Sequence, residues 1–156
     1  RIATLRRVYD PNEAVVPPHV TLVFAVDDGL EARVVAWAQT CARGAAATAM
    51  RYTRAAVTRD YENSAWYLFL MPREIPPALA QLERRLNGGS LAGAAADVAF
   101  DAHATLGRFQ ERVLAEAVAR DANGSGINVD ARIAGLRVLR FDGAAVRSSV
   151  DIPLGA

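Results

Sequence analysis

The sequence predicts an α+β fold in which the order strand, helix, hairpin occurs twice. Its 156 residues are enough for one domain, so we expect a single domain over 1–156. With 52% hydrophobic and 22% charged residues and a formal charge of +1, the chain is neither a disordered tail nor a coiled-coil rod. Its apolar runs switch between strand-like and helical spacing, which predicts two antiparallel sheets flanked by helices.

The first half of the chain opens with a short apolar run and a proline-containing loop. Pro17 and Pro18 predict that this loop delivers the chain, extended, to His19. A β-branched, apolar run then predicts a buried strand, and a helix with Gly44 after its end follows. The predicted elements are strand 2–8, strand 19–26, helix 30–43, and a hairpin of strands 46–58 and 64–71.

The second half repeats this order after a helix whose first turn contains Pro76 and Pro77. Asp142-Gly143 is a strong signal for a two-residue hairpin turn. The predicted elements are helix 75–87, strand 98–109, helix 110–122 and strands 130–140 and 144–152. Helix 110–122 is expected to bury the side chains Val113, Leu114, Ala117 and Val118.

Taking the two histidines as origins aligns the two halves. The first hairpin strand begins at a similar distance after each histidine, and the two turns also correspond. We therefore predict an internal duplication with lobes at roughly 1–72 and 73–156, related by an approximate two-fold axis.

The chain has only two histidines, and both begin the same four-residue word, H-x-T-L. On a strand, residues two apart point to the same side, so His19 would lie beside Thr21 and His103 beside Thr105. A two-fold axis would bring both pairs into one cleft. Near neutral pH, one imidazole can then act as a base and the other, protonated, as an acid. The threonine hydroxyls can donate hydrogen bonds to the oxygens of a phosphate between them.

These words, in the strings PPHVTLVF at 17–24 and HATLGR at 103–108, resemble the signature of the two-histidine (2H) phosphoesterase superfamily. The most similar group is its bacterial 2′-5′ RNA ligase-like, or RNA 2′,3′-cyclic phosphodiesterase, branch. The resemblance implies a bilobal α+β fold and hydrolysis of RNA-type 2′,3′-cyclic phosphates to 2′-phosphates, together with reversible 2′-5′ RNA ligation in which a 5′ hydroxyl replaces water. It makes His19 and His103 the acid-base pair and Thr21 and Thr105 the phosphate-holding residues.

Arg108 is a further candidate for a substrate contact, because a guanidinium can grip a phosphate with two hydrogen bonds. Its odd spacing from His103 directs it to the other side of a regular strand, and a bulge at Gly107 would bring it back. Trp66, Tyr67 and Phe69 alternate along a predicted strand, where one face can stack a base, although packing is the commoner use. Cys41 lies on an apolar helix stripe and is expected in the core rather than as a nucleophile.

No metal and no cofactor are expected, since two histidines without cysteines or a matching carboxylate pair fall short of a ligand set. No apolar run is long enough to span a membrane. The lone Cys41 and the lack of a signal-peptide pattern favour the cytoplasm. The near-neutral charge argues against binding to duplex DNA, so RNA ends or small cyclic-phosphate nucleotides are the expected partners of a monomer. The alternative is a non-catalytic module that binds nucleotides or RNA ends.

Overall fold

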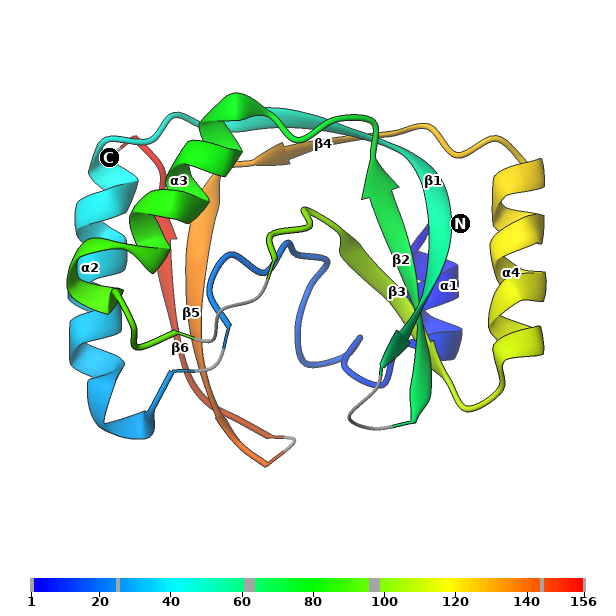
Figure 1. Cartoon of the computed structure of the whole chain (residues 1–156), viewed down its shortest axis with the longest axis horizontal. Helices are drawn as coiled ribbons and strands as arrows, with labels where there is room; N and C mark the ends of the chain where they lie inside the picture. The colour runs from blue at the N-terminus through cyan, green and yellow to red at the C-terminus, as the bar shows by residue number, and fades with distance from the viewer. Residues whose placement is uncertain (1, 25, 61–63, 96–98, 144, 156) are drawn as a thin grey trace. The chain divides into compact units, whose positions relative to one another are not determined.

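The structure, a computed structural model, describes residues 2–24, 26–60, 64–95, 99–143 and 145–155. A first sheet has the strand order β3-β2-β1-β4, and a second sheet pairs β5 with β6. These sheets and the helices confirm the predicted α+β class. The elements are α1 Ile2–Tyr9, η1 Asp28–Leu30, α2 Glu31–Arg43, β1 Thr48–Asp60, β2 Ala65–Pro72, α3 Pro77–Asn87, η2 Gly89–Leu91, β3 Ala104–Phe109, α4 Arg112–Gly124, β4 Val129–Ile133, β5 Gly135–Asp142 and β6 Ala145–Pro153 (Figure 1).

The chain forms two compact units, each assembled from three separate segments. The first unit contains Arg1–Thr21, Arg51–Glu74 and Ala102–Ala131, and the second contains Leu22–Met50, Ile75–Asp101 and Arg132–Ala156. Each unit therefore takes segments from both of the halves that the sequence suggested, 1–72 and 73–156. The internal duplication stays a prediction.

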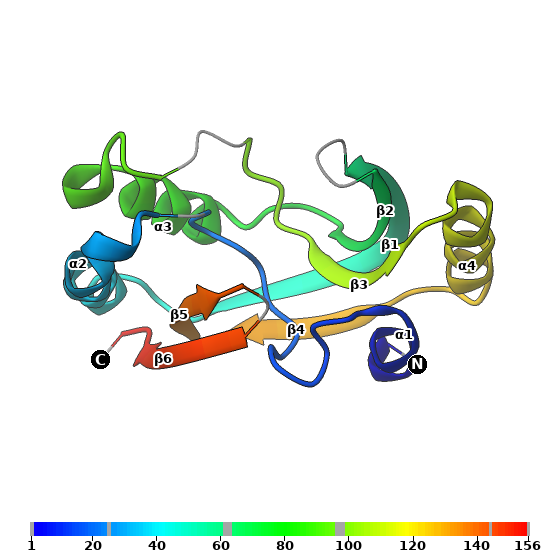
Figure 2. The same ribbon diagram turned by 90° about the horizontal axis from the view of Figure 1, so that it is seen from below.

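In the first unit, α1 and α4 pack against the strands β2 and β3 (Figures 1 and 2). Leu68 of β2 and Leu106 of β3 are completely buried. The rings of Tyr9 on α1 and Phe109 on β3 lie 4.8 Å apart between centroids, which fixes the end of the helix against the strand. The core of this unit thus lies on the helix-covered side of the sheet.

The prediction of a strand at 2–8 was wrong, because this segment forms the helix α1. Its partly buried side chains Ile2, Leu5 and Tyr9 recur at helical rather than alternating spacing. The helix also places Arg6 one turn before Asp10, and the two side chains form a buried ion pair. A short apolar run offered too few residues to distinguish the two spacings.

The prediction for the buried face of α4 was also wrong. Val113 is 73% and Leu114 is 47% exposed, whereas the helix buries the small side chains of Ala115, Ala119 and Ala122. Small side chains allow the helix backbone to approach the sheet closely. This approach lets the Asn123 side chain bond both main-chain groups of Ala55 on β1, at 2.8 and 2.9 Å.

The prediction of a strand at 19–26 was wrong: the described residues of this segment have no regular secondary structure. The carbonyl of Leu22 accepts a hydrogen bond from the Asn87 side chain of α3 at 2.8 Å instead of joining a strand ladder. Leu22 and Val23 pack against the apolar core of the second unit. The first histidine word therefore passes from one unit into the other between Thr21 and Leu22.

The second unit has its own core of α2, α3 and the β5-β6 hairpin. Its buried members are Ala38, Cys41, Ala42, Leu82, Leu86 and Ile152. The predicted strand 130–140 is divided at Ala134 into β4 and β5, and here the chain passes from the first sheet to the second. The Ala134 carbonyl accepts a hydrogen bond from the Leu154 N–H. Gly143, with φ 59°, supplies the turn that Asp142-Gly143 predicted.

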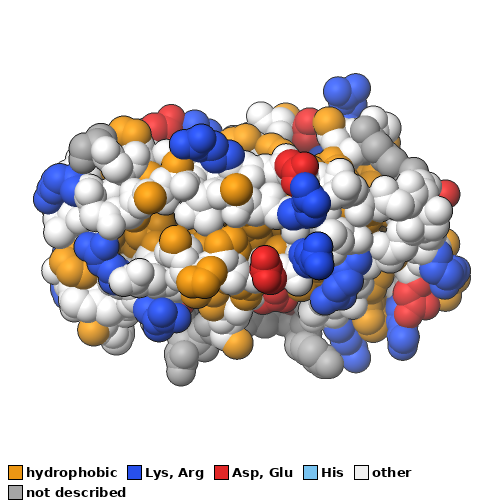
Figure 3. Space-filling view, turned by 90° about the horizontal axis from the view of Figure 1, so that it is seen from above, with side chains coloured by type: hydrophobic (Ala, Val, Ile, Leu, Met, Phe, Trp, Pro, Cys, Tyr) orange, Lys and Arg blue, Asp and Glu red, His pale blue; other side chains and the backbone are white. Residues whose placement is uncertain are grey.

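All 18 of the lysine and arginine positions in the sequence are arginine, because the chain has no lysine. On the face that Figure 3 shows, these side chains are scattered and acidic side chains lie among them. Within the described ranges, no helix combines the length and apolarity that a membrane crossing requires.

The structure predicts that Gly107→Ala destabilises the protein. A Cβ at this position would lie 2.6 Å from Cβ of Tyr9 and 3.2 Å from its carbonyl oxygen, so α1 would have to move. Overpacking of this kind costs about 1–3 kcal/mol, which urea denaturation can measure. Gly124→Ala is the matched control, because no atom lies within 4 Å of a Cβ there and φ is not positive. An unchanged free energy of unfolding in Gly107→Ala would contradict the close packing of α1 on β3.

Candidate active site

The second histidine word positions its imidazole against an aromatic ring. His103 directly precedes β3, and its ring stacks on Phe69 of β2 with centroids 3.7 Å apart and planes 20° apart. Phe69 in turn stacks on Tyr67, with centroids 5.6 Å apart. Thr105 pairs with Phe69 across the sheet, so the two side chains lie on one face. His103 and Thr105 therefore share a face, as the sequence suggested.

A bulge in β3 brings Arg108 to this same face. Leu68 pairs with Gly107, but the next residue, Phe69, pairs with Thr105, so Leu106 is one extra residue in β3. Beyond the bulge, Arg108 pairs with Tyr67. Because Tyr67 and Phe69 are two residues apart on β2, their partners Arg108 and Thr105 point to the same side. We call His103, Thr105, Arg108, Phe69 and Tyr67 together the site face.

Charged groups surround the phenol of Tyr67. Burial raises the pKa of Tyr67, and the Asp60 carboxylate, which accepts its hydrogen bond, raises it further. The Arg108 guanidinium acts in the opposite direction. Tyr67 is thus a neutral hydrogen-bond donor at physiological pH, beside a permanently charged arginine.

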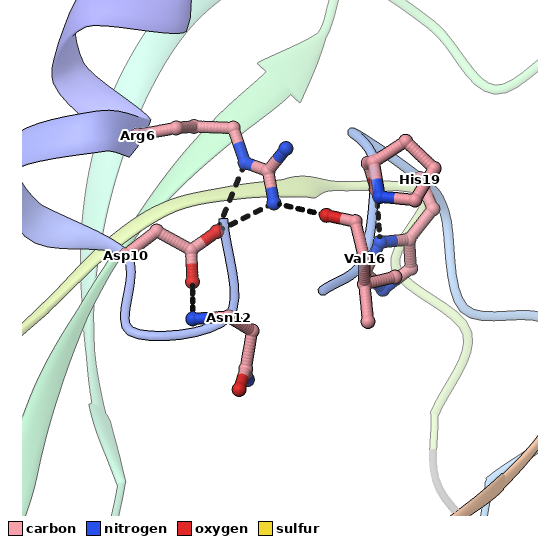
Figure 4. Close-up of polar contacts among 6 residues, drawn as sticks. Arg6, Asp10, Asn12, Val16 and His19 are labelled. Carbon is pink, nitrogen blue, oxygen red and sulfur yellow. Dashed lines mark hydrogen bonds and ion pairs between the residues drawn. The ribbon is translucent and has the colours of Figure 1, made fainter. Parts of the chain in front are cut away.

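The first histidine lies on an irregular segment and is exposed. Its Nδ1 is 2.9 Å from the carbonyl oxygen of Pro17 (Figure 4). A carbonyl oxygen can only accept, so Nδ1 carries a proton and donates it, which leaves Nε2 as the nitrogen that exchanges protons. Thr21, two residues later, is half-buried and ends the first segment of the first unit.

Sequence reasoning missed the buried ion pair that anchors the loop before His19. Arg6 is 3% and Asp10 is 9% exposed, and Nη2 of Arg6 lies 2.7 Å from Oδ2 of Asp10. The i, i+4 spacing of the two residues was the available signal, and the strand expected at 2–8 concealed it.

The structure brings all five sequence-predicted site residues into the first compact unit. These residues are His19, Thr21, His103, Thr105 and Arg108. Cys41 belongs to the second unit, is completely buried, and has a pKa raised by that burial, as expected of a core thiol rather than a nucleophile. Among the residues that the structure describes, no three of His, Cys, Asp and Glu gather as ligands for a metal ion.

Comparison with known protein families decides the relationship. The family model of the 2′-5′ RNA ligase superfamily matches residues 1–145. The chain belongs to this superfamily. The match confirms the resemblance to 2H phosphoesterases that the two H-x-T words indicated. Compared with curated proteins, the sequence has no significant match.

The site face suits the chemistry of phosphate esters in this member of the 2′-5′ RNA ligase superfamily. It combines an imidazole, a hydroxyl and a guanidinium on one side of β2 and β3. These groups supply a proton carrier, a neutral hydrogen-bond donor and a positive charge. Membership of the superfamily supports a phosphoesterase or ligase-like activity.

We expect opposite pKa shifts of Tyr67 in two variants. Asp60→Asn removes a negative charge and should lower the pKa of Tyr67, whereas Arg108→Gln removes a positive charge and should raise it. Alkaline titration followed by ultraviolet absorbance measures this, with Tyr67→Phe identifying the contribution of Tyr67 among the four tyrosines. If Arg108→Gln left the titration unchanged, Arg108 would not lie beside Tyr67 and the assignment of its face would be wrong.

Proposed function

We propose that this protein is a metal-independent phosphoesterase that hydrolyses RNA-type 2′,3′-cyclic phosphates to 2′-phosphates, and that it also carries out reversible 2′-5′ RNA ligation when a 5′ hydroxyl replaces water. The observation that carries the proposal is the occurrence of His19, Thr21, His103 and Thr105 in one compact unit of a superfamily member. His19 and His103 are its acid-base pair, and Thr21 and Thr105 hold the phosphate.

The reaction needs two proton transfers at one phosphorus atom. In hydrolysis, one neutral imidazole takes a proton from water while the water oxygen bonds to phosphorus. The bond from phosphorus to the ribose 3′ oxygen breaks, and the other imidazole, initially protonated, gives its proton to that oxygen. The product is a 2′-phosphate with a free 3′ hydroxyl. In ligation a 5′ hydroxyl takes the place of water: its oxygen bonds to phosphorus and loses its proton to one imidazole, the same bond to the 3′ oxygen breaks, and a 2′-5′ phosphodiester forms. Cleavage of that linkage is the reverse of this step.

The hydrogen bond to the Pro17 carbonyl leaves Nε2 of His19 available to act as either a base or an acid. Because Nδ1 donates to this carbonyl, Nε2 accepts a proton when the ring is neutral and donates one when it is charged. This hydrogen bond also restricts rotation of the ring, so that Nε2 keeps its direction through turnover.

Thr21, Thr105 and Arg108 are the proposed phosphate contacts. The hydroxyls donate hydrogen bonds to non-bridging oxygens, and the guanidinium compensates their negative charge. Nε of Arg108 is buried and has no hydrogen-bond partner among the residues that the structure describes. A phosphate oxygen would satisfy this donor, which supports a role for Arg108 in substrate binding.

The proposed substrates are RNA ends or small cyclic-phosphate nucleotides rather than duplexes. The net charge of +1 gives little general attraction for a polyanion, so affinity must come from local contacts. Tyr67 on the site face offers an aromatic ring beside Arg108 for such contacts, whereas Phe69 already stacks on His103. One chain holds both histidine words, so we propose that a monomer suffices, acting on RNA in the cytoplasm.

Activity on a 2′,3′-cyclic mononucleotide should survive EDTA and require both histidines. We expect a bell-shaped pH dependence of kcat/KM, because one imidazole must be neutral and the other protonated. His19→Ala and His103→Ala should each lower kcat by at least about 10²-fold, the usual contribution of a general acid or base. Phosphorus NMR of the product should show the 2′-phosphate.

Arg7→Ala is a suitable control, since Arg7 is exposed on α1 next to the buried Arg6 and should leave turnover unchanged. Full activity in either histidine variant would rule out the acid-base pair. Tight binding of the nucleotide without any turnover by the unaltered protein would instead favour the binding module.

A further inference from the structure

Neither histidine is held by a regular strand. His19 lies on an irregular segment, and His103 lies just before the first residue of β3. An acid-base pair must nevertheless hold its reactive nitrogens within a fraction of an ångström of the productive geometry. Other contacts must therefore fix the two rings.

The buried Arg6–Asp10 pair organises the loop that leads to His19. Nε of Arg6 donates to Oδ2 of Asp10 at 2.9 Å, and Nη2 donates to the carbonyl oxygen of Val16 at 2.8 Å. The other carboxylate oxygen of Asp10 accepts the N–H of Asn12 at 2.9 Å. One guanidinium thus ties together the start and the end of the loop from Asp10 to Val16 (Figure 4).

This anchoring ends one residue before the group that bonds His19. Val16 is 5% exposed and fixed by Arg6, and the next residue, Pro17, supplies the carbonyl that accepts from Nδ1 of His19. Pro17 and Pro18 restrict φ in between, so a shift of Val16 passes directly to the imidazole. A buried ion pair adds little net stability, because the cost of removing both charges from water offsets their attraction. We therefore assign to the Arg6–Asp10 pair the role of specifying the loop conformation.

The second ring is held by a different contact. The Phe69 ring stacks on the His103 imidazole at 3.7 Å and is itself backed by Tyr67 at 5.6 Å. A ring packed face to face against another cannot rotate about its χ2 angle without losing that contact. The plane of the His103 ring, and with it the direction of its nitrogens, is therefore set by β2.

We propose that Arg6 and Phe69 are positioning residues, each for one histidine: Arg6 for His19 through the loop, and Phe69 for His103 through stacking. The catalytic part of this inference rests on the proposed function, but the structural part does not. Neither residue touches the substrate in this proposal.

The chain suits a direct test, since it has only two histidines and its imidazole Cε1–H region in a proton NMR spectrum therefore contains two signals. The His19→Ala and His103→Ala variants assign them. Arg6→Lys keeps the positive charge but loses the planar guanidinium, which donates hydrogen bonds to both Asp10 and Val16. This variant should shift or broaden the His19 signal alone. Arg7→Lys, one position along α1, should move neither signal.

Phe69→Leu should shift the His103 signal alone, because the ring current of the stacked phenyl is removed, and Phe69→Tyr should restore it. Phe109→Leu is the matched control. It also removes a phenyl ring from the sheet of the first unit, but Phe109 packs against Tyr9 on the helix-covered side. Arg6→Lys and Phe69→Leu also serve as controls for each other, because general destabilisation of the protein would disturb both histidine signals.

In the proposed reaction, Arg6→Lys and Phe69→Leu should each lower kcat by about 10–100-fold with little change in KM, since a displaced group costs rate rather than binding. If Arg6→Lys did not fold, Arg6→Met combined with Asp10→Leu removes the pair without leaving a buried charge and tests the same loop. Unchanged histidine signals in these variants would overturn the inference. Selective signal changes in a protein that hydrolyses no cyclic phosphate would overturn the proposed function and leave the positioning roles standing.

Discussion

The one-residue bulge in β3 is the constraint on which the rest of the site depends. Side chains alternate along a strand, so a regular β3 would send Arg108 to the side opposite His103 and Thr105. The extra residue, Leu106, returns Arg108 to their side, next to Tyr67. At the same bulge Gly107 has no side chain, and this allows Tyr9 of α1 to pack against the strand. The helix held there carries Arg6, which anchors the loop before His19.

The string HATLGR can therefore be interpreted residue by residue. In the proposed reaction His103 supplies the reactive group and Thr105 the phosphate-holding group, and Ala104 and Leu106 are buried. Gly107 permits the close approach of α1, and Arg108 adds a positive charge to the site face. The second histidine word thus contributes to the placement of the first one, because both depend on the packing of α1 against β3.

The two histidine words pointed to candidate site residues that lie in one compact unit, whereas several predictions for the backbone around them were wrong. The two H-x-T words were informative because a repeated pattern of rare residues needs no knowledge of secondary structure. The hairpin of β1 and β2 and the turn at Gly143 were also predicted, since alternation and turn residues are local signals. The bulge was foreseen only as the condition under which Arg108 would reach the site.

The features that could not be predicted from the sequence are the ones that depend on tertiary packing. Alanine is common throughout this sequence, so Ala115 and Ala119 did not mark the buried face of α4. The larger apolar side chain of Val113 predicted a buried position, but Val113 is exposed. The segment after His19 has the composition of a strand, but its Leu22 carbonyl bonds Asn87 instead of a neighbouring strand. The Arg6–Asp10 pair became recognisable only once 2–9 was known to be a helix.

In the proposed reaction both histidines act on one phosphate group. Titration of the unaltered protein with inorganic phosphate, observed through its two imidazole signals, tests it most directly. If the two imidazoles bind one phosphate, both signals move together along one binding curve with a single dissociation constant. Movement of one signal alone, or two curves with different constants, would show that the two imidazoles do not share a phosphate and would exclude the proposed acid-base pair.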